Sequence, residues 1–231
     1  MDELPVLSPW DLRERPRCGE RLRRRLSGSK GQFIAGARHS VLARLRADIA
    51  LAHTELRHPS PNDFPDPVDL LPEQVRHYGA ASRGYLALFG DRAAKALDWE
   101  RARELPELGV HFKATPGIML QRSDETLELR RVQASSRVPN IDQSALHSLA
   151  ILWEHNLRGV TVQLVAADVV ALEVQTVELC VDDIIDDAHL WFRTRVEELR
   201  SIAAQSKVVT GNECADCPYV WDCPAHRSAR R

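Results

Sequence analysis

The sequence lacks both a strong net charge and a long hydrophobic run. Its formal net charge is −2 over 231 residues, so no overall field draws the chain toward nucleic acid or an anionic membrane. The most apolar stretch, residues 160–174, is interrupted by Asp168 and is shorter than the roughly 18 residues of a membrane-spanning helix. These absences argue against a membrane protein and against a uniformly basic nucleic-acid-binding protein.

The chain also begins without the features of a secretory leader. Residues 1–11 contain acids and no apolar core segment, so we expect a cytoplasmic protein. Cytoplasmic thiols stay reduced, and clustered cysteines there favour metal binding over disulfides. With 44% hydrophobic and 28% charged residues, the composition is typical of a globular chain, and we expect a single domain over residues 1–231.

Cysteine is scarce, but three of the five cysteines lie close together near the C-terminus. Cys214, Cys217 and Cys223 have the spacing C-x2-C-x5-C, which is typical of a metal site. A structural zinc or an iron–sulfur cluster normally takes four ligands. Cys180 lies in an apolar segment and is expected to be a buried core residue, so Cys18 is the remaining candidate for the fourth ligand.

A local basic segment contrasts with the nearly neutral chain. Residues 11–30 hold seven Arg and one Lys against three acids. Such a segment can contact phosphates, although a solvated helix face is the more common explanation of an arginine run. The candidate phosphate contacts are Arg13, Arg17, Arg21, Arg24 and Arg25.

The spacing of apolar residues changes along the chain. Helical spacing predicts helices over residues 7–26, 31–58, 72–106, 140–159 and 181–206. Strict alternation predicts strands over residues 160–179 and over 108–136, the latter as a β-hairpin or meander with its turn at 122–127.

This order of elements predicts an α/β fold, with a mixed sheet flanked by helices. We expect a mainly helical part over residues 1–110, a sheet core over 111–205 and a cysteine-bearing tail over 206–231.

This layout resembles the RecB-type nuclease domains of the PD-(D/E)XK superfamily that carry an iron–sulfur cluster. The opening helix resembles the family's entry helix, which leads to the first cysteine ligand, here Cys18. A Gly-x-x-His motif places His39 at the family's active-site histidine, and Gln143 and His147 occupy the positions of a Gln-x-x-x-Tyr motif. The spacing of the C-terminal cysteines also fits the family.

The resemblance implies a restriction-endonuclease-like fold and a [4Fe–4S] cluster held by Cys18, Cys214, Cys217 and Cys223. The cluster would join a helical region at the start of the chain to its end and would stabilise the fold. Four thiolates suit zinc equally well, so zinc stays the alternative. Domains of this kind often act beside a helicase or another nuclease, so the resemblance also implies a protein partner.

The family cleaves DNA with Mg²⁺ or Mn²⁺, held by an Asp on one strand and an Asp or Glu on the next, with a Lys two residues later. Here Leu120 stands at the first acid, Arg131 at the second and Gln133 at the lysine. None of these side chains suits a divalent cation, so we expect a degenerate site. Glu128, with Arg130 two residues later, is the alternative acid.

The sequence therefore predicts a DNA-binding iron–sulfur protein without nuclease activity, acting in a DNA-processing, repair or defence assembly. We expect DNA to be bound as single strands or ends. One alternative is an active Mg²⁺- or Mn²⁺-dependent exonuclease with relocated acids, in which His39, Glu128 or Gln143 would contribute to the site. Another is a zinc-containing protein-interaction module without a nucleic-acid role.

Overall fold

The computed structural model describes residues 4–13, 18–27, 37–114, 117–135, 139, 141–205, 217 and 223. The described helices are α1 (Pro9–Arg13), α2 (Gly19–Leu26), α3 (Ala37–Ala52), α4 (Pro72–Phe89), α5 (Gln143–Leu157) and α6 (Val181–Ala204), with short 3-10 helices η1 (Pro61–Asp63) and η2 (Pro106–Leu108). The described strands are β1 (Val6–Leu7), β2 (Ala94–Leu97), β3 (Ala102–Leu105), β4 (Val110–Lys113), β5 (Ile118–Arg122), β6 (Leu127–Gln133), β7 (Thr161–Asp168) and β8 (Glu173–Cys180).

The strands form two mixed sheets. The larger sheet has five strands in the order β2-β5-β6-β7-β8, with β6 and β7 parallel and the other described neighbours antiparallel. The smaller sheet has the order β1-β4-β3, with β1 parallel to β4. Helix α5 supplies the crossover that the parallel pair β6 and β7 requires. The prediction of an α/β fold with a mixed sheet is confirmed.

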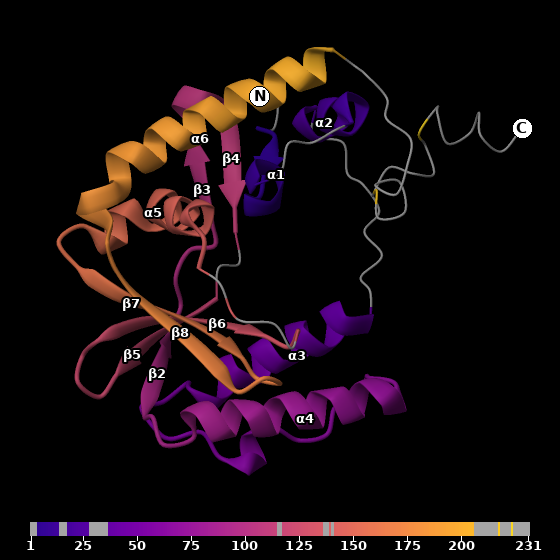
Figure 1. Ribbon diagram of the computed structural model, residues 1–231, viewed down its shortest axis with the longest axis vertical. Coiled ribbons are helices and arrows are strands. Elements are labelled where there is room, and N and C mark those ends of the chain that lie inside the picture. Colours follow the sequence, from indigo (N-terminus) through magenta and orange to yellow (C-terminus); the bar gives the residue numbers. More distant parts are fainter. Residues whose placement is uncertain are drawn as a thin grey trace, which may run out of the picture.

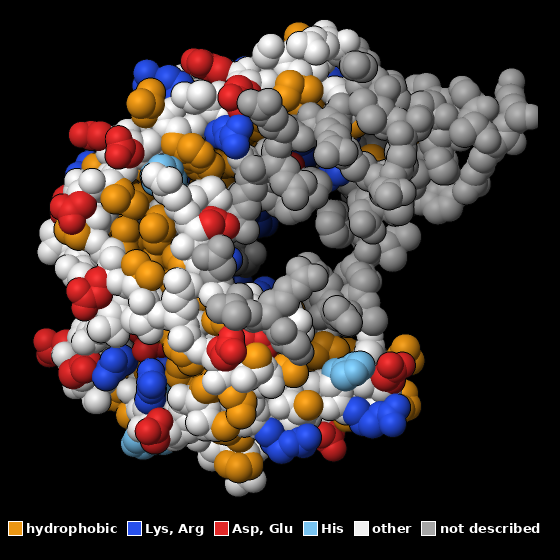
Figure 2. Space-filling view, in the orientation of Figure 1, with side chains coloured by type: hydrophobic (Ala, Val, Ile, Leu, Met, Phe, Trp, Pro, Cys, Tyr) orange, Lys and Arg blue, Asp and Glu red, His pale blue; other side chains and the backbone are white. Residues whose placement is uncertain are grey.

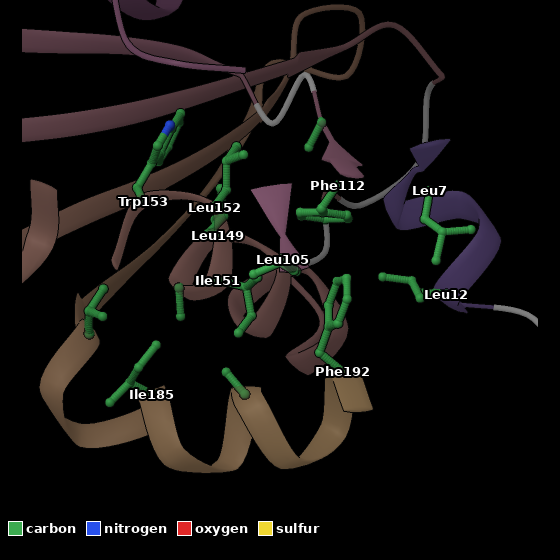
Figure 3. Packing of buried hydrophobic residues seen from close by; sticks show 14 of the residues in the cluster. Leu7, Leu12, Leu105, Phe112, Leu149, Ile151, Leu152, Trp153, Ile185 and Phe192 are labelled. Atoms are coloured by element: carbon green, nitrogen blue, oxygen red, sulfur yellow. The ribbon is translucent and has the colours of Figure 1, made fainter. Parts of the chain in front are cut away.

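Helices cover both faces of the larger sheet (Figure 1). One face packs on α5 and α6 in an apolar cluster that also includes the smaller sheet and α1. Figure 3 shows Ile151 of α5 directed toward α6, which contributes Ile185 and Phe192 to the same cluster. The ring centroid of Phe112 lies 5.0 Å from that of Phe192. The other face packs on α3 and α4 in a second cluster. Burial of apolar surface thus fixes the sheet from both sides.

The predicted hairpin consists of β5 and β6. Strand β5 ends at Arg122 and β6 begins at Leu127, so the turn lies where the sequence placed it. Glu125 has a positive φ of 66° in this turn, and the backbone N–H of Thr126 donates to the carboxylate of Asp124 at 3.1 Å. The two acids of the turn are exposed to solvent.

The prediction of helix throughout residues 72–106 was wrong in its second half. Helix α4 ends at Phe89, and residues 94–97 pair with β5. Residues 102–105 pair with β4 in the smaller sheet. The Ala and Leu residues of these segments favour helices, but pairing with neighbouring strands outweighs this weak preference.

Local interactions define both ends of α5. The carboxylate of Asp142 caps α5 by accepting from the backbone N–H of Ala145 at 2.7 Å, and Gly159 takes a left-handed φ of 70° after the helix.

Cys180 is half-buried at the start of α6, so its assignment to the buried core was wrong. None of the described helices combines the length and apolar character that crossing a bilayer requires.

Candidate functional site

The hairpin of β5 and β6 presents different side chains on its two faces. The register places Leu120 directly opposite Glu128, and residues opposite each other point to the same face. Arg130 shares that face because it lies two residues from Glu128, whereas Arg131 and Gln133 point to the other face. The structure therefore brings Leu120 together with Glu128 and Arg130, and separates it from Arg131 and Gln133.

Glu128 and Arg130 form a buried ion pair on the face that α3 and α4 cover. Both side chains are 0% exposed, and Nε of Arg130 donates to Oε1 of Glu128 at 2.6 Å. Nη1 of Arg130 donates to the hydroxyl of Tyr85 at 2.5 Å, and the guanidinium lies 3.9 Å from the ring centroid of Phe89. Leu120 beside the pair is also fully buried. A permanent cation thus neutralises the acid that β6 contributes to this face.

A chain of hydrogen bonds extends from Arg130 to the backbone of β2. The hydroxyl of Tyr85 accepts from Arg130 and donates to Nε2 of His53 at 2.8 Å, while Nδ1 of His53 donates to the carbonyl of Ala94 at 2.9 Å. This arrangement requires a neutral imidazole. Burial lowers the pKa of His53 and raises the pKa of Tyr85 to about 12, so both groups stay uncharged.

Two buried polar atoms of the ion pair make no hydrogen bond to any residue that the structure describes. Oε2 of Glu128 and Nη2 of Arg130 have no partner among the described residues. Burial alone would lower the pKa of Arg130, but Tyr85 and Glu128 raise it overall, so the guanidinium stays charged. A buried polar group without its hydrogen bond costs about 1–3 kcal/mol, and a charged one costs more. The packing of this face therefore contributes less to the free energy of unfolding than the packing of an apolar face of the same area would.

The geometry of the hairpin does not fit a Mg²⁺ or Mn²⁺ site. Such ions take about six oxygen ligands. Leu120 offers none, and a cation could reach Glu128 only by displacing Arg130. In the part of the chain that the structure describes, no group of three or more His, Cys, Asp or Glu side chains is arranged to hold a metal ion.

Gln133 lies at the carboxyl end of β6, opposite Asp168 at the end of β7. The carboxylate of Asp168 is buried and accepts from the backbone N–H groups of Ser135, Val170 and Ala171, at 3.0, 2.9 and 2.9 Å. Burial raises the pKa of Asp168, but these hydrogen bonds outweigh burial and hold the pKa at about 2. This carboxylate therefore fixes the turn between β7 and β8 to the segment that follows β6.

The other predicted site residues lie apart from the hairpin network. Gln143 is the exposed first residue of α5. His147 is buried, and its ring lies 5.4 Å from that of Trp191 on α6. Burial lowers the pKa of His147, so it acts as a neutral part of the contact between α5 and α6. The side chain of His39 lies outside what the structure describes.

The arginines of α2 are engaged with acids. Arg23 and Arg24 both donate to Glu20, each at 2.8 Å, and hydrogen bonds from Arg23 and then Arg24 lower the pKa of Glu20 to about 2. Arg25 lies 3.3 Å from the carboxylate of Asp11 on α1. The pair of Arg25 and Asp11 joins α2 to α1, whereas the two pairs with Glu20 lie within α2. In each pair the carboxylate offsets the charge of the arginine.

Arg21, Arg17 and Arg13 are the other predicted phosphate contacts. Arg21 is half-buried on α2, and Arg17 and the side chain of Arg13 lie outside the described residues. The described part of the basic segment therefore offers less uncompensated charge than its composition implies.

The described cysteines of the predicted metal site are half-buried. Cys18 is the N-cap of α2, and α2 packs against α6 (Figure 1). In the sequence, Cys217 and Cys223 follow α6. Thiolates from both ends of the chain would suit an iron–sulfur cluster or zinc. Cys214 lies outside the described residues, so the four-cysteine site stays a prediction.

The chain matches no protein-family model, and no curated protein matches it. Its function is therefore inferred from its own residues and their geometry.

The network around Arg130 was not predicted from the sequence. Tyr85 lies 45 residues from Arg130, and His53 lies 32 residues from Tyr85, so no local pattern joins them. Side chains alternate between the two faces along β5 and β6, and this places Leu120, Glu128 and Arg130 on the same face. That arrangement can be recognised in the sequence only once the register of the hairpin is known.

Proposed function

We propose that this chain is a nuclease-like, DNA-binding protein that does not cleave DNA and that contributes to a DNA-processing, repair or defence assembly. The observation that carries the proposal is the buried pair of Glu128 and Arg130 beside Leu120. Hydrolysis of a phosphodiester needs a metal ion with free carboxylate ligands and an open position for water. This chain has at that position a leucine and a carboxylate already neutralised by a guanidinium.

The architecture supports the likeness to the RecB-type domains. A mixed sheet carries a β-hairpin at the position where the resemblance puts the metal chemistry, and helices cover both faces of that sheet. The restriction-endonuclease-like fold is part of the proposal, as is a protein partner such as a helicase or an active nuclease.

The proposal includes a metal centre that joins the two ends of the chain. Cys18, Cys214, Cys217 and Cys223 would bind a [4Fe–4S] cluster, with zinc as the alternative. The packing of α2 on α6 supports this arrangement, because it brings Cys18 to the helix that leads into the cysteine-rich segment. The role of the metal centre would be to stabilise the fold.

Metal analysis of anaerobically purified protein tests this part. We expect brown protein with about four irons per chain, and loss of the iron in Cys18→Ala. Cys180→Ala is the matched control, since Cys180 is the last residue of β8 and is not a predicted ligand. About one zinc per chain would identify the alternative centre, and protein without metal would contradict both.

One observation favours a second function, that of a protein-interaction module. Arg24 and Arg25 of α2 pair with Glu20 and Asp11, which lowers the charge that this segment can offer to phosphates. Such a module would bind its partner protein and would not bind DNA.

Binding of a short fluorescein-labelled single-stranded DNA, followed by electrophoresis of the same DNA after incubation with Mn²⁺, tests the proposed function. We expect binding that weakens as salt rises, because contacts to phosphates release counterions, together with DNA that stays intact. Cleavage that depends on Mn²⁺ would establish the active exonuclease instead. Absence of binding at low salt would favour the interaction module.

A further inference from the structure

Strand β8 is an edge of the five-stranded sheet. It pairs with β7 over all eight of its residues, from Glu173 to Cys180, in a continuous register without a bulge. On the side away from β7, the backbone of residues 173–179 makes no hydrogen bond to any residue that the structure describes. The N–H and C=O groups along that side can therefore pair with a further strand.

The opposite edge of the same sheet is covered. The backbone N–H of Ala94 on β2 donates to the carbonyl of Arg57 at 3.3 Å, and that of Ala96 donates to the carbonyl of His53 at 2.5 Å. Edge strands are otherwise protected by proline, by lysine, by bulges or by shortness. Strand β8 has none of these features, so its edge differs from that of β2.

The surface around β8 is acidic. Residues 159–192 contain seven Asp or Glu and no Lys or Arg. Two of the seven are engaged, since Asp168 is buried and Asp182 lies 2.9 Å from Arg158. The other five are exposed and form no ion pair with a described residue: Glu173, Glu178, Asp183, Asp186 and Asp187. Their negative charge is therefore not compensated within the described part of the chain.

Exposed apolar side chains lie beside these acids. Val170 and Leu172 in the turn before β8 are 49% and 52% exposed, and Val174 on β8 is 40% exposed. Figure 2 shows Asp and Glu side chains, with exposed apolar side chains among them, over the region of β8 and the start of α6. A strand added at this edge would gain apolar contacts as well as backbone hydrogen bonds.

The charge of this surface decides which occupant fits it. A second copy of the chain would bring the same acids to the same edge, and like charges across a strand pair are destabilising. The phosphates of a nucleic acid would be repelled in the same way. A polypeptide segment of positive charge instead offers both backbone groups and electrostatic complementarity.

We propose that β8 binds an extended Lys- or Arg-rich segment of a partner protein, which adds to the five-stranded sheet as a sixth strand. Backbone hydrogen bonds to residues 173–179 would hold the segment, and Glu173 and Glu178 would select its basic side chains. This inference goes beyond the proposed function and does not depend on DNA binding.

The test uses the full chain and a fluorescein-labelled peptide of alternating Lys and Val, as long as β8, with binding measured by fluorescence anisotropy. We expect saturable binding that weakens as salt rises, because salt screens exposed charges. The control is the same peptide with every backbone nitrogen methylated, which keeps the charge but lacks the N–H donors. We expect the methylated peptide not to bind.

Two charge reversals test the position of the site. We expect Glu178→Lys to weaken peptide binding about tenfold, because it replaces an attraction with a repulsion. Glu104→Lys is the matched control, since Glu104 is an exposed acid on β3, an edge strand of the smaller sheet. It should bind the peptide as the wild type does.

Hydrogen exchange measured by mass spectrometry locates the bound strand. We expect the peptide to slow amide exchange in residues 173–180 and to leave exchange in β3 unchanged. Absence of binding, equal binding of the methylated peptide, or binding without slower exchange in β8 would overturn the proposal. Slower exchange that instead rises with protein concentration and needs no peptide would also overturn it, because a second copy would then occupy the edge.

This experiment contains no DNA, so its failure would leave the proposed function intact. Conversely, a chain that binds the peptide at β8 but does not bind DNA would overturn the proposed function alone.

Discussion

The two faces of the five-stranded sheet are packed with different kinds of side chain. Toward α5 and α6, strands β5, β6 and β7 present Met119, Leu129 and Leu164, which are buried in one apolar cluster. Toward α3 and α4, the central strand β6 instead buries Glu128 and Arg130. The first face is stabilised by the apolar area removed from water. The second loses part of that gain because two charges have left water as well.

This difference locates the candidate site. A buried ion pair can often be replaced by apolar side chains without loss of stability, so packing alone does not explain Glu128 and Arg130. They lie where the resemblance puts the metal chemistry, opposite Leu120. In the proposed function, the guanidinium of Arg130 takes the place that a metal cation would occupy, which retains a carboxylate but removes its reactivity.

Removing the acid alone should give the largest effect. In Glu128→Leu, the guanidinium of Arg130 would stay buried without its counter-ion, so we expect the free energy of unfolding to fall by about 3–5 kcal/mol. Urea unfolding followed by circular dichroism measures this change. A loss below about 1 kcal/mol, which is the value of an exposed pair, would mean that the two faces do not differ as described.

Removing both charges should restore most of that loss. Glu128→Leu/Arg130→Met makes the polar face resemble the apolar one, and we expect a stability within about 1 kcal/mol of the wild type or above it. The same urea experiment on the wild type, single and double variants gives the coupling between the two residues. A double variant less stable than Glu128→Leu would contradict the view that the pair is costly.

A smaller effect should appear in the pH dependence of stability. Each face buries a histidine, His53 beside Tyr85 and His147 beside Trp191, and burial lowers the pKa of both below the usual 6.5. The unfolded chain therefore binds protons more readily than the folded chain. Stability is full above pH 6.5 and falls as the pH drops below that value.

Urea unfolding at about pH 7 and about pH 5 checks this expectation. Burial raises the pKa of Glu154 and of Asp168, but hydrogen bonds outweigh it and hold both at about 2, below their ordinary values of 4.5 and 3.8. The stability that these acids contribute is therefore lost mainly as the pH falls below 4.5, outside this window. We expect a smaller drop in His147→Phe, which removes one of the two groups. Equal stability at the two pH values would show that the histidines are not held neutral.

Local signals in the sequence predicted much of the architecture. The alternation on both sides of the turn at 122–127 predicted the hairpin, and the helical spacing over residues 140–159 predicted α5. These features depend on a few neighbouring residues, so their physical cause is present in the sequence itself.

The parts that were not predicted depend on distant pairing. Residues 94–97 became a strand because β5 offers them a neighbour, and no nearby residue signals this. The assignment of Leu120, Arg131 and Gln133 to one site failed because the register separates them onto two faces. A spacing along the chain cannot distinguish the faces until the pairing of the strands is known.

The most direct test of the central claim is isothermal titration of the purified protein with Mn²⁺. We predict that the wild type and Glu128→Gln give the same heats, because Arg130 already occupies the carboxylate of Glu128. A saturable site in the wild type that disappears in Glu128→Gln, while circular dichroism shows the variant still folded, would contradict the claim. It would mean that the hairpin binds a catalytic metal after all.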